Sequence, residues 1–199
     1  MREVGSLSRE QDLVELVDIT GSAVGSATVS DAHTAPGQLH RAFSVLLFDR
    51  EGRTLLQQRA SVKTRFPLRW ANACCGHPPP GVPVVEAATR RLAEELGVAG
   101  VPLTDVGVYT YRAEDEATGR VEYEYDHVLV GHVTGELTVT PDPNEVAATR
   151  WVPAATLVPT GDDYAPWLSG VLPIALAAVP DVAPGVTPGV TPGPGRPGE

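Results

Sequence analysis

Histidines and glutamates that could bind a metal ion occur in four separate segments of the chain. Glu122 and Glu124 lie two positions apart in a stretch typical of a β-strand, so both project from the same face. Two neighbouring carboxylates repel one another unless a cation lies between them, so the pair indicates a cation site. The alternative interpretation is that both glutamates lie on a strand face exposed to solvent. The other candidates are His33, His40 and His77, and a lone histidine is more often a structural residue than a ligand.

Cys75 could act as an acid or base. It lies in Cys75-Gly76-His77-Pro78, a turn in which glycine lets the backbone approach a ligand closely. A nearby metal or cationic group would stabilise its thiolate, which could then act as a base. The alternative interpretation is that Cys75 is a buried, unreactive side chain. Cys74 is the only other cysteine. Because a disulfide between adjacent residues is strained, we expect free thiols and a reducing, cytoplasmic location.

The segment from Gly76 to Val98 resembles the Nudix signature. Gly76, Arg90, Leu92, Glu94, Glu95, Gly97 and Val98 stand at the required offsets. Val82 replaces an acidic residue of the signature, and Arg91 replaces a glutamate. Nudix hydrolases use these glutamates to hold the divalent ions that activate water, and a cation there removes a ligand and repels the metal. The segment predicts a diphosphate-binding fold and argues against hydrolysis.

From about residue 13 to residue 170 the chain resembles the type I isopentenyl-diphosphate isomerases. The motifs occur in the family's order and near its spacing. They are Ala32-His33-Thr34 with His40, Arg59 with Lys63, Trp70-x-Asn72-x-x-Cys75-Gly76-His77-Pro78, the helix from Arg90 to Val98, Tyr111-Arg112, Glu122-Tyr123-Glu124 and Ala165-Pro166-Trp167.

The resemblance implies two cations and a substrate site. His33, His40, His77, Glu122 and Glu124 would form one metal site, whose ligands suit Mn²⁺ or Fe²⁺, with Zn²⁺ also possible. Glu95 would hold a Mg²⁺ bridged to the diphosphate of a small isoprenoid substrate. Arg59, Lys63 and Arg91 would contact that diphosphate. For Arg91 the alternative is a surface pair with Glu95, four residues away on one helix.

The activity implied is the interconversion of isopentenyl and dimethylallyl diphosphate. One proton is added to the alkene and another is lost, which requires two acid/base groups on opposite faces. The resemblance assigns Cys75 and Glu124, with Tyr111 assisting Glu124. Trp167 would be an aromatic wall that stabilises the cation, although a plain core aromatic is the alternative. A Nudix diphosphohydrolase and a non-catalytic diphosphate- or metal-binding module are the other function classes.

The elements that would position these residues are mostly strands. Residues 13–19 and 23–29 resemble a hairpin, and residues 42–48 and 54–59 another pair. Further strands are predicted at 106–112, 121–133, 137–140 and 147–152. Helices are predicted at 84–96, with Gly97 as cap, and at 165–178, kinked at Pro173. The pattern predicts an α+β fold, which the resemblance makes an α/β/α sandwich with a mixed sheet and the Nudix box on a helix.

Composition limits the partners. The chain of 199 residues carries a formal net charge of -10 and no basic run, so we expect no nucleic acid. No secretory signal or membrane span is expected, and the resemblance implies a monomer or weak dimer. We expect a tail at 1–12, one domain at 13–179, and a disordered tail rich in proline and glycine at 180–199.

Overall fold

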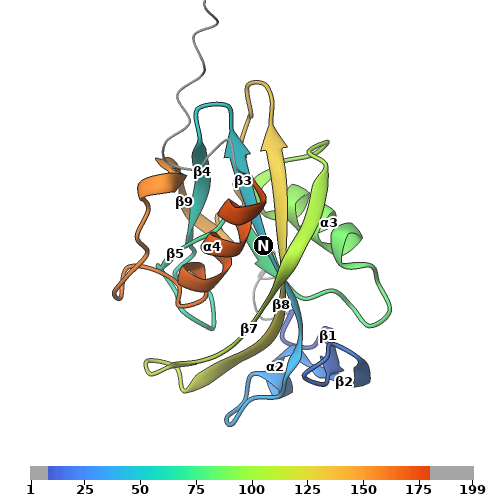
Figure 1. Ribbon diagram of the computed structural model, residues 1–199. Helices are drawn as coiled ribbons and strands as arrows, with labels where there is room; N and C mark the ends of the chain where they lie inside the picture. The colour runs from blue at the N-terminus through green and yellow to red at the C-terminus, as the bar shows by residue number, and fades with distance from the viewer. Residues whose placement is uncertain (1–8, 180–199) are drawn as a thin grey trace, which may run out of the picture.

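Within residues 9–179, a mixed sheet of nine strands has one long helix against each face (Figure 1). The computed structural model describes residues 9–179, so the predicted tail at 180–199 lies outside the described residues. The elements, in chain order, are β1 (Leu13–Val17), β2 (Ala23–Thr28), α2 (Val29–Ala32), β3 (His40–Asp49), β4 (Arg53–Arg59), β5 (Trp70–Ala71), β6 (Cys74–Gly76), α3 (Val84–Leu96), β7 (Leu103–Asp115), β8 (Arg120–Val133), β9 (Val146–Pro153), the 3₁₀ helix η1 (Ala154–Thr156) and α4 (Leu168–Ala178).

β3 is the central strand, and its nearly continuous apolar sequence is typical of a strand covered on both faces. One edge pairs with β8 in parallel along the whole strand, and the other pairs with β6 in antiparallel fashion. Successive side chains alternate between two cores. Phe43, Val45 and Leu47 belong to the core that contains α3 residues, and Leu46 and Phe48 to the core that contains α4 residues.

The helix predicted at 84–96 is confirmed as α3. Ala88, Leu92 and Leu96 are buried against the sheet, while Val85, at the start of the helix, is 37% exposed. Gly97 ends the helix in the left-handed conformation with φ of 66°, and its N–H donates to Ala93 O at 3.0 Å. Glycine adopts this conformation without the cost that a Cβ imposes.

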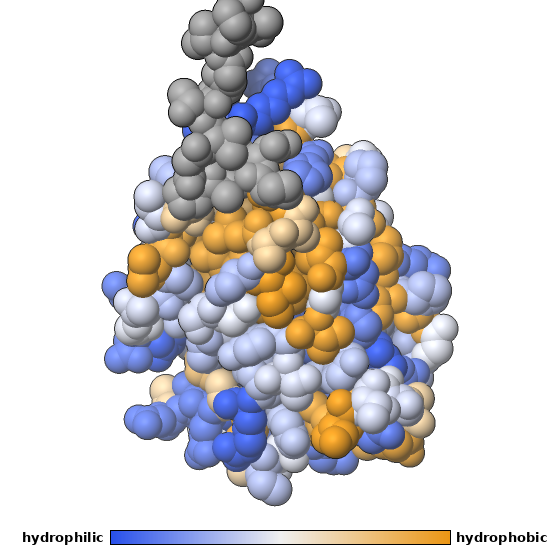
Figure 2. Space-filling model, viewed as in Figure 1, coloured by the Kyte–Doolittle hydropathy of each residue, from blue (hydrophilic) through white to orange (hydrophobic). Residues whose placement is uncertain are grey.

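The second helix begins later than predicted, at Leu168 rather than residue 165, and contains Pro173 as expected. α4 has no charged residue, and Leu168, Val171, Leu172 and Ala175 are buried. Apolar side chains gather over α4 on the face shown in Figure 2. No helix within residues 9–179 is long and apolar enough to cross a bilayer.

Two predictions about strands were wrong or incomplete. Residues 137–140 form no strand. Leu137 and Val139 do pack against the α3 core, but the Thr140 N–H donates to Leu96 O at 2.7 Å and thereby satisfies a carbonyl at the end of α3. β4 pairs with β3 only at Phe48 and Thr54, beside the turn, and along its remaining length it pairs with β9. β6 occupies the edge of β3 that β4 leaves free.

Candidate active site

Three neighbouring strands place one candidate residue each in a single row. In the parallel register of β3 and β8, His40 lies opposite Glu124, and in the antiparallel register of β7 and β8, Tyr111 lies opposite the same glutamate. Paired residues in a sheet project from the same face. The row His40, Glu124, Tyr111 therefore follows from strand pairing alone.

The remaining metal-ligand candidates converge on this row. His33 directly follows the short helix α2, His77 follows β6, and Glu122 precedes Glu124 on β8. One potential ligand atom from each of His33, His40, His77, Glu122 and Glu124 lies within 4.8 Å of all the others. The three imidazole ring centroids are 4.6 to 5.0 Å apart. All five residues that the sequence singled out as ligands are thus in one cluster.

The hydrogen bonds of the histidines leave lone pairs directed into this cluster. His33 Nδ1 donates to Val29 O at 2.6 Å, and His40 Nδ1 donates to Gln38 O at 2.7 Å. Because a carbonyl can only accept, Nδ1 carries a proton, and in the neutral ring Nε2 then carries the lone pair. His33 Nε2 lies 2.8 Å from Glu122 Oε2, yet among the described residues neither atom has a hydrogen-bond partner. Two buried acceptors at this distance repel one another unless a cation binds both.

The charges in the cluster match a cation site. Burial by itself would raise the pKa of Glu122, but the His33 ring, in its protonated form, and Arg65 hold it well below its usual value. Burial and Glu122 would raise the pKa of Glu124, but the neighbouring His40 and His77 rings lower it. Burial lowers the pKa of His77 to about 4. At neutral pH both carboxylates are therefore ionised and His77 is neutral, which are the protonation states that metal ligands require.

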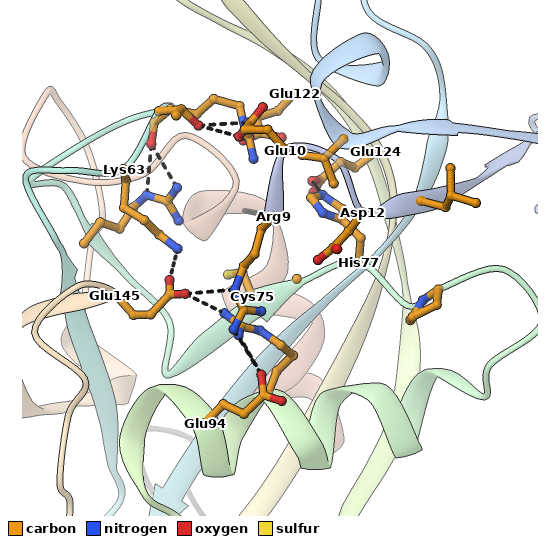
Figure 3. A pocket seen from close by; sticks show the side chains of 18 of the residues that line it. Arg9, Glu10, Asp12, Lys63, Cys75, His77, Glu94, Glu122, Glu124 and Glu145 are labelled. Carbon is orange, nitrogen blue, oxygen red and sulfur yellow. Dashed lines mark hydrogen bonds and ion pairs between the residues drawn. The ribbon is translucent and has the colours of Figure 1, made fainter. Parts of the chain in front are cut away.

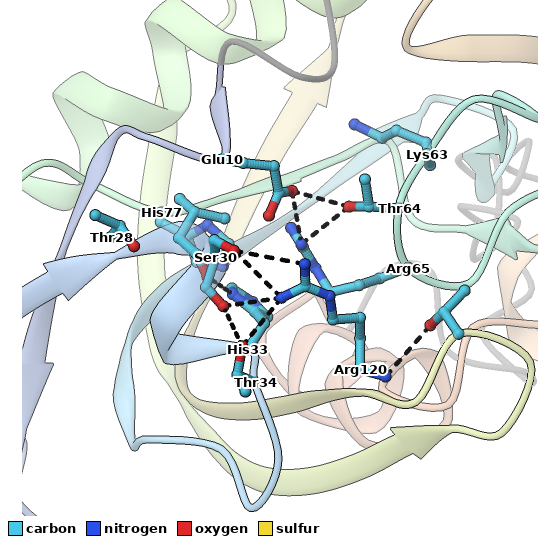
Figure 4. Close-up of polar contacts among 12 residues, drawn as sticks. Glu10, Thr28, Ser30, His33, Thr34, Lys63, Thr64, Arg65, His77 and Arg120 are labelled. Atoms are coloured by element: carbon cyan, nitrogen blue, oxygen red, sulfur yellow. Dashed lines mark hydrogen bonds and ion pairs between the residues drawn. The ribbon is translucent and has the colours of Figure 1, made fainter.

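Arg65, which the sequence analysis did not single out, connects the cluster to the N-terminal segment. Its Nη1 donates to Glu10 Oε1 at 2.9 Å (Figure 4). Its Nε donates to Glu122 Oε1 at 3.1 Å. Glu10 also accepts a 2.9 Å hydrogen bond from Thr64. Residues around Glu10 belong to the predicted tail at 1–12, yet they lie against the site. The one available signal was the position of Arg65, two residues after Lys63 in a basic loop.

A pocket of about 700 Å³ opens beside the cluster, a size typical of small-molecule sites. Charged side chains of both signs line it and face one another in Figure 3. The cations are Arg9, Arg59, Lys63, Arg65, Arg90 and Arg91, and the anions are Glu10, Asp12, Glu94, Glu122, Glu124 and Glu145. This local concentration of basic residues is what an acidic protein needs in order to bind a phosphorylated ligand.

Glu145 holds the cations at the end of the pocket that α3 borders. It contacts Lys63, and its Oε1 lies 3.3 Å from Arg91 Nη2 and 3.2 Å from Arg9 Nε. Arg91 also pairs with Glu94 at 2.8 Å and contacts Glu95. Arg91 lines the pocket, whereas Glu95 is 2% exposed behind it. The ion pair between Arg91 and Glu95, which the sequence analysis gave as the alternative to a diphosphate contact, is therefore present. It lies beside the pocket and not on an open surface.

Arg59 and Trp167 form an adjoining part of the wall. Arg59 donates to Arg65 O at 2.9 Å and to Phe66 O at 3.1 Å, and its guanidinium carbon lies 5.3 Å from the centroid of the Trp167 ring. Trp167 is only 3% exposed and belongs to the core around α4. Trp167 is therefore a core aromatic that also lines the pocket.

Cys75 and Tyr111 line the same pocket as Glu124. Both cysteines are free, and Cys74 is fully buried in the α3 core. Burial, followed by the charge of Asp126, raises the pKa of Cys75 to about 12, which favours the thiol over the thiolate. The Tyr111 hydroxyl donates to Glu124 Oε2 at 2.7 Å, and burial together with Glu124 raises its own pKa well above the usual value.

Solved structures with the same fold include two of different origin. One is DR0079 from Deinococcus radiodurans, with a TM-score of 0.59, 18% identity, and coverage of 82% of this chain and 99% of that one. The other is a MutT NUDIX hydrolase from Burkholderia pseudomallei, with a TM-score of 0.53, 26% identity, and coverage of 68% and 97%. The NUDIX domain family matches residues 38–171. The predicted α+β Nudix fold is confirmed.

Curated relatives are considerably more similar. An isopentenyl-diphosphate Delta-isomerase of Nocardia farcinica is 64% identical over 169 residues, covering 83% of this chain and 95% of the relative. Another, of Streptomyces coelicolor, is 48% identical over 172 residues, covering 85% and 86%. These matches extend over most of this chain and most of both relatives. The chain thus belongs to the isopentenyl-diphosphate Delta-isomerases of the NUDIX superfamily.

Proposed function

We propose that this isomerase interconverts isopentenyl diphosphate and dimethylallyl diphosphate in isoprenoid biosynthesis, with Cys75 and Glu124 as its acid/base groups. The observation that carries the assignment is that the Cys75 thiol and the Glu124 carboxylate line one pocket beside a dense group of basic residues. Moving the double bond requires one proton to be delivered and another to be removed. Cys75 is poised to donate and Glu124 to accept, with the roles reversed in the return reaction.

Tyr111 assists Glu124 in this assignment. Its hydroxyl remains protonated and donates to Glu124 Oε2, while Glu124 Oε1 lies 2.9 Å from His77 Nε2. The two carboxylate oxygens are thereby fixed in direction. A proton taken up by Glu124 can be shared with Tyr111 along this hydrogen bond, which keeps the base on the side of the pocket where the substrate must lie.

The five-residue cluster would hold a divalent metal ion, for which its three imidazole nitrogens and two carboxylates suit Mn²⁺ or Fe²⁺, with Zn²⁺ as another candidate. Such an ion would supply positive charge that tunes the acidity of Glu124. Glu95 would hold Mg²⁺ at the diphosphate, which requires that Arg91 release its carboxylate. We infer that Arg91 turns from Glu95 to the diphosphate when substrate binds, joining Arg59 and Lys63.

Trp167 supplies the aromatic wall in this proposal. A π-face against the hydrocarbon part of the substrate stabilises positive charge by about 2 kcal/mol when water is excluded. The wall is rigid because Trp167 is buried in the core around α4 and packs at 5.7 Å against the Phe66 ring. A rigid wall costs no reorganisation when the cation forms.

The adjacent cysteines provide a matched pair for the test. Cys75→Ala removes the acid/base group but no metal ligand, so turnover of isopentenyl diphosphate should be abolished while the metal content stays that of the wild type. Cys74→Ala changes a neighbouring cysteine in the opposite core and should retain turnover. Isomerisation is measured by conversion to dimethylallyl diphosphate in metal-loaded protein. More than a few per cent of wild-type turnover in Cys75→Ala would exclude Cys75 as an acid/base group.

We further propose that the protein works in a reducing compartment such as the cytoplasm, because both of its cysteines are free and one is the proposed acid/base group. A monomer or weak dimer is the expected oligomeric state, and sedimentation velocity in an analytical ultracentrifuge measures it. A tight oligomer at micromolar concentration would contradict that expectation.

A further inference from the structure

Asn72 lies between β5 and β6, beside the wall of the pocket, and its side chain is fully buried. All four of its hydrogen-bonding positions are used. The amide nitrogen donates to Val45 O at 3.2 Å and to Cys74 O at 2.9 Å. The amide oxygen lies 3.0 Å from Trp167 Nε1 and 3.2 Å from Cys75 Sγ.

The chemistry of the partners fixes which way the amide points. Backbone carbonyls only accept hydrogen bonds, and an indole N–H only donates. The nitrogen of Asn72 must therefore face Val45 and Cys74, and the oxygen must face Trp167. Neither end can be exchanged without leaving buried polar groups unpaired, which costs more than the hydrogen bonds are worth individually.

This orientation determines the direction of the Cys75 thiol. The sulfur faces an amide oxygen that can only accept, so Cys75 must be the donor and its S–H points at Asn72 Oδ1. The Ser44 hydroxyl oxygen lies 3.7 Å away on the other strand of the β3–β6 pair and limits how far the sulfur can move.

We propose that Asn72 is a positioning residue for the isomerisation. Its single amide oxygen accepts hydrogen bonds from the Cys75 thiol and the Trp167 indole and so fixes the position of both groups on the pocket wall. The inference rests on the proposed function, because it takes Cys75 as an acid/base group and Trp167 as the aromatic wall. Because Cys75 and Trp167 are hydrogen-bonded to the same oxygen of Asn72, a displacement of one side chain moves the acceptor of the other. Misplacement of reacting groups by about 1 Å can reduce a rate by about a hundredfold.

The two ends of the amide have separable tasks. Val45 and Cys74 are cross-strand partners, so the nitrogen joins the backbones of β3 and β6 and supports the scaffold. The oxygen contacts only the two side chains that line the pocket. The oxygen is therefore the end of Asn72 that can position the two pocket side chains.

The kinetic test compares Asn72→Ala with Val133→Ala, a core change at the far end of β8 that should lower the melting temperature without affecting the site. Asn72→Ala should lower kcat by about tenfold to a hundredfold with little change in KM, because the acid/base group and the wall lose their alignment. Val133→Ala should keep kcat. Wild-type kcat in folded Asn72→Ala would overturn the inference.

A spectroscopic test does not depend on turnover. The chain has three tryptophans, so the ¹H–¹⁵N spectrum shows three indole signals, and the one that Trp167→Phe removes belongs to Trp167. This signal should shift upfield in Asn72→Ala. An unchanged signal would show that the indole does not depend on Asn72.

A second spectroscopic measurement needs no change at Asn72, which keeps the inference testable if Asn72→Ala does not fold. In Cys74→Ala, the infrared S–H stretch belongs to Cys75 alone, and it should lie at the lower frequency of a hydrogen-bonded thiol. A free S–H frequency would overturn the inference. If both spectra agree with it but wild-type protein fails to isomerise isopentenyl diphosphate, the proposed function fails and the arrangement at Asn72 stands.

Discussion

Tyr111 and Glu124 lie directly opposite one another on β7 and β8, and the Tyr111 hydroxyl donates a 2.7 Å hydrogen bond to the Glu124 carboxylate. Strand pairing places the two residues side by side on one face, so the contact does not depend on a loop conformation. Glu124 is in turn the parallel partner of His40 on β3. The proposed base is thereby fixed from both sides by neighbouring strands of the sheet.

This geometry predicts the effect of Tyr111→Phe. The substitution keeps the ring and removes the hydroxyl, so Glu124 loses the partner that directs one of its oxygens, and kcat should fall by about tenfold to a hundredfold. Tyr109→Phe is the matched control, because the ring of Tyr109 stacks on that of Tyr111 at a centroid distance of 5.5 Å. Steady-state isomerisation kinetics measure both. Equal activity of the two variants would contradict the role of Tyr111.

The main effect of Glu122→Gln should be a loss of metal affinity. The substitution removes a negative charge from a carboxylate whose Oε2 faces His33 Nε2, and we expect at least about a tenfold loss of affinity. Metal content after dialysis against a buffered chelator, measured by elemental mass spectrometry, checks this. Glu114→Gln, an exposed change on β7, should retain the wild-type content. Full metal occupancy in Glu122→Gln would remove this residue from the ligand set.

Arg65→Gln should also reduce metal affinity, although Arg65 is no ligand. The guanidinium pairs with Glu122 Oε1 and with Glu10, so its loss leaves the Glu122 carboxylate without the contact that orients it. Residues that orient metal ligands typically contribute about tenfold to a hundredfold in affinity. Arg69→Gln, which breaks an exposed pair with Asp162, is the control. The same chelator competition measures both variants, and identical affinities would show that Arg65 is dispensable.

Glu145→Gln should change how stability depends on pH. Lys63, Arg91 and Arg9 lower the pKa of Glu145 below its ordinary value of 4.5, against the opposing effect of burial. Because the folded pKa is the lower one, the carboxylate contributes stability above about pH 4.5, and this contribution is lost as the pH falls through the folded pKa. The variant should therefore melt below the wild type at neutral pH.

The difference in melting temperature between wild type and Glu145→Gln should shrink as the solution is acidified, which thermal melts across the acidic range measure. Glu136→Gln, an exposed change in the segment after β8, should follow the wild type throughout. A constant difference at every pH would mean that the substitution acts through packing and not through charge.

The sequence by itself determined which residues could form the site. Two glutamates at strand spacing had to share a face, since side chains alternate along a strand. Apolar spacing with Gly97 at the end predicted α3 correctly, because helical periodicity and a C-terminal glycine are local properties. The Nudix-like segment with Arg91 in place of a glutamate indicated a diphosphate site without the hydrolase's full set of acidic residues.

Only the tertiary structure decided how these residues meet. The parallel register of β3 with β8 places His40 beside Glu124, and no local pattern encodes a pairing between strands so distant in the sequence. Residues 137–140 alternate as a strand would, yet the Thr140 N–H satisfies the end of α3 instead of joining the sheet. Arg65, Glu145 and Asn72 acquire their roles from charges and hydrogen-bonding groups that folding brings to them from other elements. Such contacts depend on long-range packing, which spacing along the chain does not record.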